Sequence, residues 1–220
     1  LWKKAFKENI TSIITGHNYV TEAILPACMR WSKLDVANIK DIHRKFSKTP
    51  LKTFPLLDFW TYTYYQKMRD FELFPLLNYM EYNKDEAKKI IIEKMGWRDY
   101  GGKHYESFFT KFYQGYVLKE KFGYDKRKAH LATLINSGQI TKEEALQELK
   151  KPAYPPEDLE KDIEYFCKKM GFTREEFEQI MKEPEVPHTK YKSYETGLYR
   201  HHEKVMTTLR PITRLVKKII

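Results

Sequence analysis

The stretch "YESFFTKFYQGY", residues 105–116, decides the fold of the second half of the chain. Its aromatic residues recur at i, i+3, i+4, i+7, i+8 and i+11, the spacing that places side chains on one face of an α-helix. Burial in a core requires this strict spacing, so we expect a core helix rather than a platform on which nucleic-acid bases stack. The stripe consists of Tyr105, Phe108, Phe109, Phe112, Tyr113 and Tyr116.

Downstream of this stripe the sequence predicts further helices and no strand. Asp125 is placed to cap the next helix, which is expected to end near residue 138. Thr141 and Thr173 each precede a Glu by three residues, which is the spacing of a capping box. Between these boxes, the helix that follows Pro156 is predicted to bury Leu159, Ile163, Phe166, Cys167 and Met170. We therefore expect residues 96–220 to form a helical C-terminal region.

Upstream of Gly96 the pattern changes to strands that alternate with helices. Residues 12–15 are short, β-branched and followed by a glycine turn, which predicts a buried strand. The segment "LFPLLNY", residues 73–79, is a second strand candidate, although Pro75 weakens it. Strands that alternate with helices are typical of a parallel α/β sheet. We therefore expect residues 1–95 to be an α/β domain, with its boundary near Gly96.

Helices are predicted on both sides of the second strand candidate. One spans residues 35–46 with Asp35 as its N-cap, and an aromatic-rich one spans residues 56–70. A third begins after Asn83 and carries Ala87, Ile90, Ile91 and Met95 on one face. At the C-terminus, a short docking helix is expected from one apolar face made of Ile212, Leu215, Val216, Ile219 and Ile220.

The composition is that of a globular protein with a basic surface. The 40 Lys and Arg residues exceed the 30 Asp and Glu residues, which gives a net charge of +10. This charge suits an anionic partner, such as a nucleotide, a sugar nucleotide, nucleic acid or an acidic protein, without choosing among them. Cys28 and Cys167 lie far apart in the sequence, so we expect neither a disulfide framework nor a paired-thiol zinc site, and a reducing cytoplasm is the simplest setting. No apolar run reaches membrane-spanning length and no signal peptide is visible.

The first candidate site is "TGHNYVTE", residues 15–22, at the carboxyl end of the first predicted strand. Ligands of open α/β sheets bind at this edge. Gly16 allows a tight turn, His17 and Asn18 can donate to phosphate oxygens, and Glu22 can hold Mg²⁺. The alternative is a plain strand-to-helix turn in which Asn and Thr side chains satisfy backbone groups.

The second candidate site combines "WRDYGGKHYE", residues 97–106, with "KFGYDKRKAH", residues 121–130. A glycine pair lets backbone amides approach an anion closely. Two of the basic residues are three apart on a predicted helix and therefore share a face. The alternative is a solvated basic helix preceded by a glycine turn. The candidate residues for binding phosphate or substrate are Arg98, Gly101, Gly102, Lys103, His104, Lys126, Arg127 and His130.

The block "MGWRDYGGKHYESFFTKFYQGYVLKEKFGYDKRKAHLATLINSGQITKEEAL", residues 95–146, resembles the C-terminal block of the bacterial N-acetyl sugar amidotransferase family. The similarity extends back through "PLLNY" and the "ITGHN" motif, and it fades after residue 160. Members of this family are PP-loop ATP pyrophosphatase-type proteins associated with lipopolysaccharide O-antigen, pseudaminic acid and legionaminic acid pathways.

The resemblance implies a fold and a reaction. The implied fold is the C-terminal part of a parallel-sheet PP-loop domain, of the adenine nucleotide alpha-hydrolase-like type, followed by an all-helical region. The implied reaction converts a sugar acetamido group into an acetamidino group. ATP would adenylylate the amide oxygen with release of pyrophosphate, and ammonia would then displace AMP. Positive charge and Mg²⁺ assist the departure of pyrophosphate.

The resemblance also implies ligands and partners. ATP and Mg²⁺ are the implied cofactors, and a nucleotide-linked N-acetyl sugar is the implied substrate. A glutaminase and an ammonia-channel subunit would supply ammonia. On this interpretation Gly16, His17 and Asn18 lie at the nucleotide edge, while Arg98, Lys103, His104, Lys126 and Arg127 bind phosphate or the sugar nucleotide. No catalytic residue is assigned from the sequence.

The chain departs from the family pattern in two respects, because the PP-loop itself, Ser-Gly-Gly-x-Asp-Ser, and the Cys-rich start usual in the family are both absent from the sequence. The chain also opens on Leu1 rather than Met. We therefore expect an N-terminal part, carried elsewhere or on a separate PP-loop chain, to complete the ATP and Mg²⁺ site. The alternatives are an inactive truncated remnant and a basic RNA-binding or tRNA-modifying PP-loop relative. Basic residues spread along the whole chain without an RNA motif argue against nucleic acid.

Overall fold

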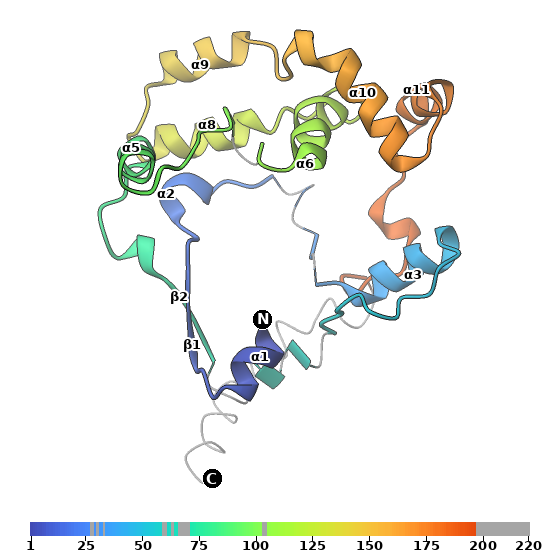
Figure 1. Cartoon of the computed structure of the whole chain (residues 1–220), viewed down its shortest axis with the longest axis horizontal. Helices are drawn as coiled ribbons and strands as arrows, with labels where there is room; N and C mark the ends of the chain where they lie inside the picture. The colour runs from blue at the N-terminus through green and yellow to red at the C-terminus, as the bar shows by residue number, and fades with distance from the viewer. Residues whose placement is uncertain are drawn as a thin grey trace. The chain divides into compact units, whose positions relative to one another are not determined.

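The computed structural model describes residues 1–26, 29, 31–32, 34–58, 61–62, 64–65, 71–102 and 105–196 (Figure 1). The chain divides into two units. The first unit contains Leu1–Ile13, Cys28–Glu72 and Val186–Ile220. The second unit contains Ile14–Ala27 and Leu73–Glu185. The predicted division into residues 1–95 and 96–220 stays a prediction.

The second unit is mostly helical. Its helices are α2 (Tyr19–Glu22), α5 (Lys84–Met95), α6 (Phe108–Phe112), α7 (Leu118–Glu120), α8 (Arg127–Asn136), α9 (Lys142–Lys150), α10 (Pro156–Met170) and α11 (Arg174–Lys182). Both predicted capping boxes are present: Thr141 Oγ1 accepts from the amide of Glu144, and Thr173 Oγ1 accepts from the amide of Glu176. After residue 96 the described part of the chain contains no strand, as the sequence predicts.

The aromatic stripe forms one helical run that changes its winding in the middle. A π-helical turn, η4 (Tyr113–Val117), joins α6 to α7 without a break. Gly115 lies in this turn, where an added Cβ would come 2.8 Å from the ring of Tyr154 and 3.1 Å from the carbonyl oxygen of Ala153. Only glycine therefore lets the segment before α10 pack so closely on this turn.

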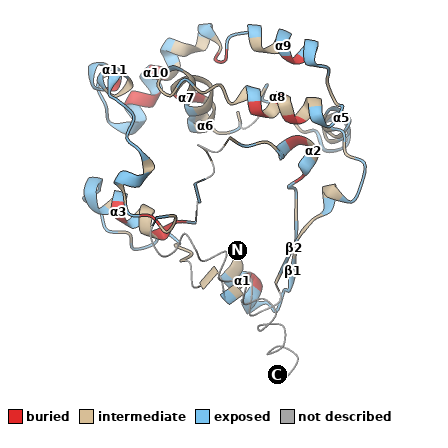
Figure 2. Ribbon diagram, turned by 180° about the vertical axis from the view of Figure 1, so that it is seen from behind, coloured by how far each residue is buried: buried red, intermediate tan, exposed pale blue. Residues whose placement is uncertain are grey.

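The core of the second unit lies between this run, α10 and α11. The side chain of Phe112 is 0% exposed, and its ring contacts those of Phe166 and Phe177 at centroid separations of 4.8 and 6.0 Å. Figure 2 shows the buried part of α10, which carries Ile163, Phe166 and Cys167. Phe112 is therefore core, as predicted, with Phe108 and Tyr116 partly buried against it. Two further rings of the predicted stripe are not core, since Phe109 and Tyr113 are 51% and 37% exposed. Burial of a ring such as Phe112 stabilises the unit by about 1.5–3 kcal/mol.

Helix α5 departs from the expectation for an amphipathic helix. Asn83 caps it, because its side-chain oxygen accepts hydrogen bonds from the amides of Asp85 and Glu86. None of its residues is buried, however, and Met95 is 78% exposed. Ile90 on the predicted apolar face is also 51% exposed, and Ala87 and Ile91 are only partly buried, so this face is incompletely covered.

The first unit is built around α3 (Val36–Phe46), with α1 (Trp2–Lys7) and a short 3-10 helix, η5 (His188–Lys190). Asp35 caps α3 as predicted, since its carboxylate accepts from the amide of Asn38 at 2.9 Å. The ring of Trp2 contacts those of Tyr65 and Phe71. The helix predicted for residues 56–70 falls partly outside the described residues, and that predicted for residues 212–220 falls entirely outside them.

The described strands form a small parallel sheet. Strand β1 (Ser12–Thr15) pairs with β2 (Glu72–Pro75), and no further strand pairs with them in the described part of the chain. The first strand has the predicted bounds, but it is not buried as predicted, since Ile14 is 68% exposed. The second strand ends at Pro75 and continues as a 3-10 helix, η3 (Leu76–Asn78). Proline cannot donate to a strand ladder, which explains this early end. The fold is therefore a small parallel sheet with mostly helices.

Candidate functional site

The first candidate stretch is a capped turn between β1 and α2. Asn18 is buried at the N-cap of α2, and its Oδ1 accepts from the amide and the hydroxyl of Thr21 at 2.8 and 2.9 Å. This commits the side-chain oxygen of Asn18 to the helix, as in the simple turn that the sequence left open. Gly16 and His17 are exposed, and a Cβ at Gly16 would meet nothing within 4 Å. The backbone at Gly16 is thus open to an approaching ligand.

Helix α2 packs against α8, which carries part of the second candidate stretch. The amide of Ile24 donates to the hydroxyl of Thr133 at 3.2 Å, and that hydroxyl donates to the carbonyl of Ala129 at 3.0 Å. Burial and the negative charge of Glu22 raise the pKa of Tyr82, so Glu22 and Tyr82 lie near each other. The structure therefore brings the end of β1 together with the helix that bears Arg127 and half-buried His130, while Lys126 holds the N-cap position of α8.

Arg127 has a visible structural role. Its Nε and Nη2 donate to the carboxylate of Asp125 at 3.0 and 2.7 Å. Its Nη1 donates to the carbonyl oxygen of Lys151 at 2.9 Å, just past the end of α9. Partial burial raises the pKa of Asp125, but the hydrogen bonds from Arg127 outweigh it and lower that pKa overall. An anion that binds Arg127 would have to compete with these acceptors, so phosphate binding by Arg127 stays a prediction.

The glycine pair forms a turn whose geometry requires glycine for two different reasons. Gly101 has φ +83°, a left-handed conformation, and its amide donates to Asp99 Oδ1 at 2.9 Å. Asp99 in turn pairs with Lys88 on α5. An added Cβ at Gly102 would lie 2.8 Å from the ring of Tyr105. The turn is therefore closed on one side by that ring.

The turn lies farther from the aromatic helix than the sequence suggests. Helix α6 begins at Phe108, and Ser107 caps it by accepting from the amide of Thr110 at 3.4 Å. Arg98 is exposed, whereas Lys103 and His104 lie outside the described residues. Anion binding by the glycine pair and its neighbours stays a prediction.

A polar cluster that the sequence reasoning missed lies beside the aromatic core. Lys111 Nζ donates to Asp158 at 2.9 Å and lies 3.4 Å from Asp162, and the hydroxyl of Tyr154 donates to Asp162. The ammonium also lies 5.0 Å from the centre of the Tyr154 ring. Two signals could have found it: Lys111 interrupts the aromatic run, and the two aspartates are four residues apart on one helix.

The environment of this cluster shifts the pKa values of its members. Burial alone would lower the pKa of Lys111, but the carboxylates of Asp158 and Asp162 outweigh it and raise that pKa. Burial and the hydrogen bond to Asp162 raise the pKa of the Tyr154 hydroxyl. Lys111 is therefore held as a cation and Tyr154 as a neutral donor, which suits a fixed ion cluster better than proton transfer near neutral pH.

In the first unit a serine, a histidine and an aspartate lie together. Ser193 Oγ donates to Asp35 Oδ2 at 2.6 Å, and His188 Nε2 lies 3.2 Å from the same Oγ. In a hydrolytic triad the histidine stands between the serine and the acid, because it must take the hydroxyl proton. Here the serine stands in the middle, and its proton is directed at the carboxylate. The group therefore fastens residues 188–194 to α3 rather than activating a nucleophile.

Metal and membrane chemistry receive no support from the described residues. Within them, no group of three His, Cys, Asp or Glu side chains is arranged to hold a metal ion. None of their helices has the length and apolarity to cross a membrane.

Comparison with known proteins relates the helical part of the chain to a family. Residues 106–206 match the model described as LPS biosynthesis protein WbpG-like, C-terminal domain. The matched segment begins just before α6 and includes the aromatic core, the Lys111 cluster and η5. No curated protein and no solved structure matches the chain. The chain is therefore similar, over this segment, to the C-terminal domain of lipopolysaccharide biosynthesis proteins.

Proposed function

We propose that the chain is the C-terminal portion of an ATP-dependent N-acetyl sugar amidotransferase that acts in bacterial surface polysaccharide or flagellin sugar biosynthesis. The match of residues 106–206 to the WbpG-like C-terminal domain carries this proposal. The long sequence block that resembles the amidotransferase family, residues 95–146, overlaps the matched segment and supports the finer assignment.

The reaction that we propose replaces the oxygen of a sugar acetamido group by nitrogen. An amide carbonyl is a weak electrophile, so its oxygen must first become a leaving group. ATP would supply that leaving group by adenylylation, with loss of pyrophosphate. Ammonia from a glutaminase, passed on through a channel subunit, would add to the amide carbon, and AMP would depart with the former amide oxygen. The product is an acetamidino sugar.

The role that we propose for this chain is to support the nucleotide edge and to bind the sugar nucleotide. The exposed backbone at Gly16 and the side chain of His17 follow β1, at the strand end where ligands of α/β sheets bind. The packing of α2 on α8 fixes this edge against the helical region. Exposed Arg98 is an available cation for a diphosphate.

ATP and Mg²⁺ enter the proposal only as ligands of a complete PP-loop domain. The Ser-Gly-Gly-x-Asp-Ser loop, whose amides would hold pyrophosphate, is not in this sequence. Among the described residues, the oxygen of Asn18 is already committed to capping α2. A PP-loop chain is therefore the partner that we propose for nucleotide binding.

The test is reconstitution. The purified chain is mixed with ATP, Mg²⁺, a nucleotide-linked N-acetyl sugar and ammonium, with and without an N-terminal PP-loop portion. We expect pyrophosphate release, and replacement of amide oxygen by NH in the sugar by mass spectrometry, only when both portions are present. Pyrophosphate release by the chain alone would contradict the requirement for the PP-loop. Reconstituted samples that bind the sugar nucleotide but never form the amidine would contradict amidotransfer.

A control separates this proposal from RNA binding. The net charge of +10 would attract tRNA through its phosphates, so weak, salt-sensitive retention is expected in a filter-binding assay. Retention that survives high salt and discriminates among tRNAs would favour a tRNA-modifying relative instead.

A further inference from the structure

Helix α3 is fastened through one face and leaves its apolar face open. On the fastened face, Asp35 and Asp41 are both buried. Asp35 accepts from the amide of Tyr194 at 2.8 Å, and Asp41 accepts from the amide of Lys192 at 3.2 Å. These contacts hold the segment after η5 against α3. The face that lines the hollow adds two contacts with this segment: Asn38 donates to the carbonyl oxygen of Lys192 at 3.2 Å, and the ring of Phe46 has one edge contact with Tyr191.

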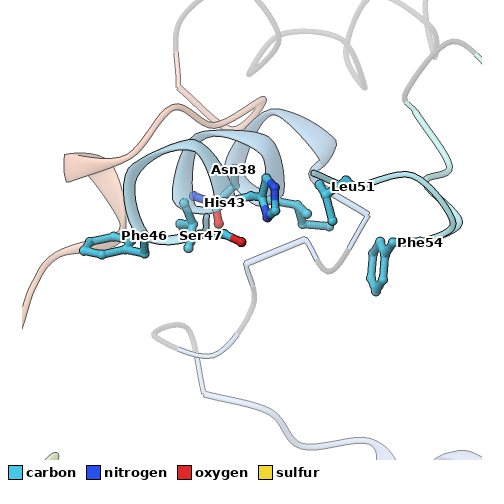
Figure 3. Close-up of a pocket in the computed structure, with 8 residues that line it drawn as sticks. Asn38, His43, Phe46, Ser47, Leu51 and Phe54 are labelled. Carbon is cyan, nitrogen blue, oxygen red and sulfur yellow. The ribbon is translucent and has the colours of Figure 1, made fainter. Parts of the chain in front are cut away.

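The open face lines a surface hollow of about 450 Å³ (Figure 3). Its apolar side chains come from α3 and from the segment that follows it: Ile39, Ile42, Phe46, Leu51 and Phe54. Figure 3 shows Phe46 at one end of the hollow and Phe54 at the other. Phe46 is 70% exposed and Phe54 is 56% exposed. Exposed apolar residues gathered in a concave surface mark interaction sites, whereas scattered ones do not.

The segment that lines the hollow is basic. Lys48 and Lys52 are exposed and follow the lining residues Ser47 and Leu51 directly in the sequence. Within residues 36–57 the one acidic residue is Asp41, and it is already paired with Arg44 and Lys45 at 2.6 and 2.8 Å. The lining segment therefore carries net positive charge beside its apolar side chains.

From this combination we infer that the hollow is a docking site for an acidic amphipathic segment of a partner protein, whose apolar side chains would fill the hollow and whose carboxylates would pair with the exposed Lys48 and Lys52 of the lining segment. Aromatic anchors in a hollow supply affinity, and rim charges supply selectivity and association rate. The inference is independent of the amidotransferase proposal.

Other occupants fit the same surface less well. The chain's own apolar C-terminal segment carries Arg214, Lys217 and Lys218, which the positive charge of the lining segment would repel. A second copy brings another net charge of +10. Aliphatic walls such as Ile39 and Ile42 do not stack nucleic-acid bases. A bilayer is flat and requires apolar groups that project, not a concave floor.

The experiment selects peptides against the full-length chain. A displayed library of short random peptides is enriched on the wild-type chain and counter-selected on Phe46→Ser. We expect the surviving peptides to combine Asp or Glu with Leu, Ile or Phe at helical spacing. Their dissociation constants, measured by calorimetry, should rise about tenfold or more in Phe46→Ser. The double variant Lys48→Glu, Lys52→Glu should weaken binding mainly at low salt.

Matched controls keep the test specific. Met95→Ser removes an exposed apolar side chain elsewhere, and Lys89→Glu reverses an exposed charge elsewhere. Neither should change peptide affinity. Circular dichroism of each variant checks that the helices remain.

Four outcomes would overturn the inference. One is enrichment of basic or uncharged peptides, and another is equal affinity for wild type and Phe46→Ser. A third is a wild-type dimer in sedimentation that Phe46→Ser dissociates, which would make a second copy the occupant. The fourth is loss, in Phe46→Ser, of binding to phosphatidylglycerol vesicles or to single-stranded RNA when no acidic peptide binds.

Discussion

Two helices of this chain carry phenylalanine rings, α6 three and α3 one, that lie in opposite environments. On α6, Phe112 is fully enclosed by rings from α10 and α11. On α3, Phe46 projects from the helix end and borders an open hollow. Both helices carry apolar side chains on one face, so the difference arises from the elements that pack against them. Helix α6 meets two further amphipathic helices, whereas α3 is held by carboxylate contacts on its other face.

The difference teaches that the two regions are stabilised by different physics. Around α6, burial of apolar surface supplies most of the stabilising free energy. Around α3, buried Asp35 and Asp41 accept hydrogen bonds from the backbone of residues 192–194. A polar fastening leaves the apolar face of a helix available to a partner. The following four experiments test this contrast, from the largest expected effect to the smallest.

Phe112→Ala should be the most damaging change. It removes a fully enclosed ring and leaves a cavity among aromatic neighbours, so we expect a loss of about 3–5 kcal/mol in the free energy of unfolding. Urea unfolding followed by circular dichroism measures this. The matched change Phe46→Ala, at an exposed ring with one edge contact to Tyr191, should cost less than about 1 kcal/mol. Equal losses for the two variants would refute the contrast.

Gly115→Ala tests the close approach in the π-helical turn. The new methyl group would lie 2.8 Å from the ring of Tyr154 and 3.1 Å from a backbone carbonyl. Since a backbone oxygen cannot move freely, we expect a loss of about 1–3 kcal/mol. Gly16→Ala, where the added atom meets nothing within 4 Å, is the control and should stay close to wild type. A neutral Gly115→Ala would mean that the turn repacks without strain.

Lys111→Met asks whether the aromatic region also depends on charge. The change keeps the stem of the side chain but leaves the carboxylates of Asp158 and Asp162 without their cation. We expect a loss of about 1–2 kcal/mol, because the group is only partly buried. Lys151→Met breaks an exposed pair with Glu148 and should change stability by less than about 0.5 kcal/mol. If both variants behave alike, the cluster is no more than a surface ion pair.

Acid should loosen the fastening of α3 without opening the aromatic core. The side-chain hydrogen bond from Lys45 and the amide of Lys192 lower the pKa of Asp41 from 3.8 to about 2. The folded pKa lies below the unfolded one, so this stabilisation is complete above pH 3.8 and is lost as the pH falls through about 2.

The measurement is site-resolved amide exchange between these pH values. Exchange at Lys192 and Tyr194 should accelerate before exchange in α10 does. Asp41→Asn should show the faster exchange at Lys192 already at neutral pH. Simultaneous loss of protection in both regions would show that they open as one.

Much of the local structure followed from the sequence. The caps at Asp35, Asn83, Thr141 and Thr173 were predictable because a cap depends on side chains within three residues. The aromatic stripe was predictable because its spacing matches one helix face. The end of β2 at Pro75 was foreshadowed by the missing amide of proline.

Part of the candidate site was predictable as well. The position of Gly16 and His17 after β1 follows from the strand pattern. The structural use of Asn18 was an open alternative in the sequence, and the capping geometry decides it. The roles of Lys103 and His104 stay predictions, because these residues lie outside the described part of the chain.

Only the tertiary structure decided which groups the charged and aromatic side chains contact. The sequence suggests that Arg127 is a free cation, but its N–H groups donate to the carboxylate of Asp125 and to the carbonyl oxygen of Lys151. In the sequence Lys111 only interrupts the aromatic stripe, but in the structure its ammonium group donates hydrogen bonds to Asp158 and Asp162. Both α3 and α6 carry an apolar face, yet Phe46 on α3 is 70% exposed whereas Phe112 on α6 is buried. Helix propensity, capping and periodicity act within a few residues and are written in the sequence, whereas burial and ion pairing depend on groups that meet only after distant segments pack.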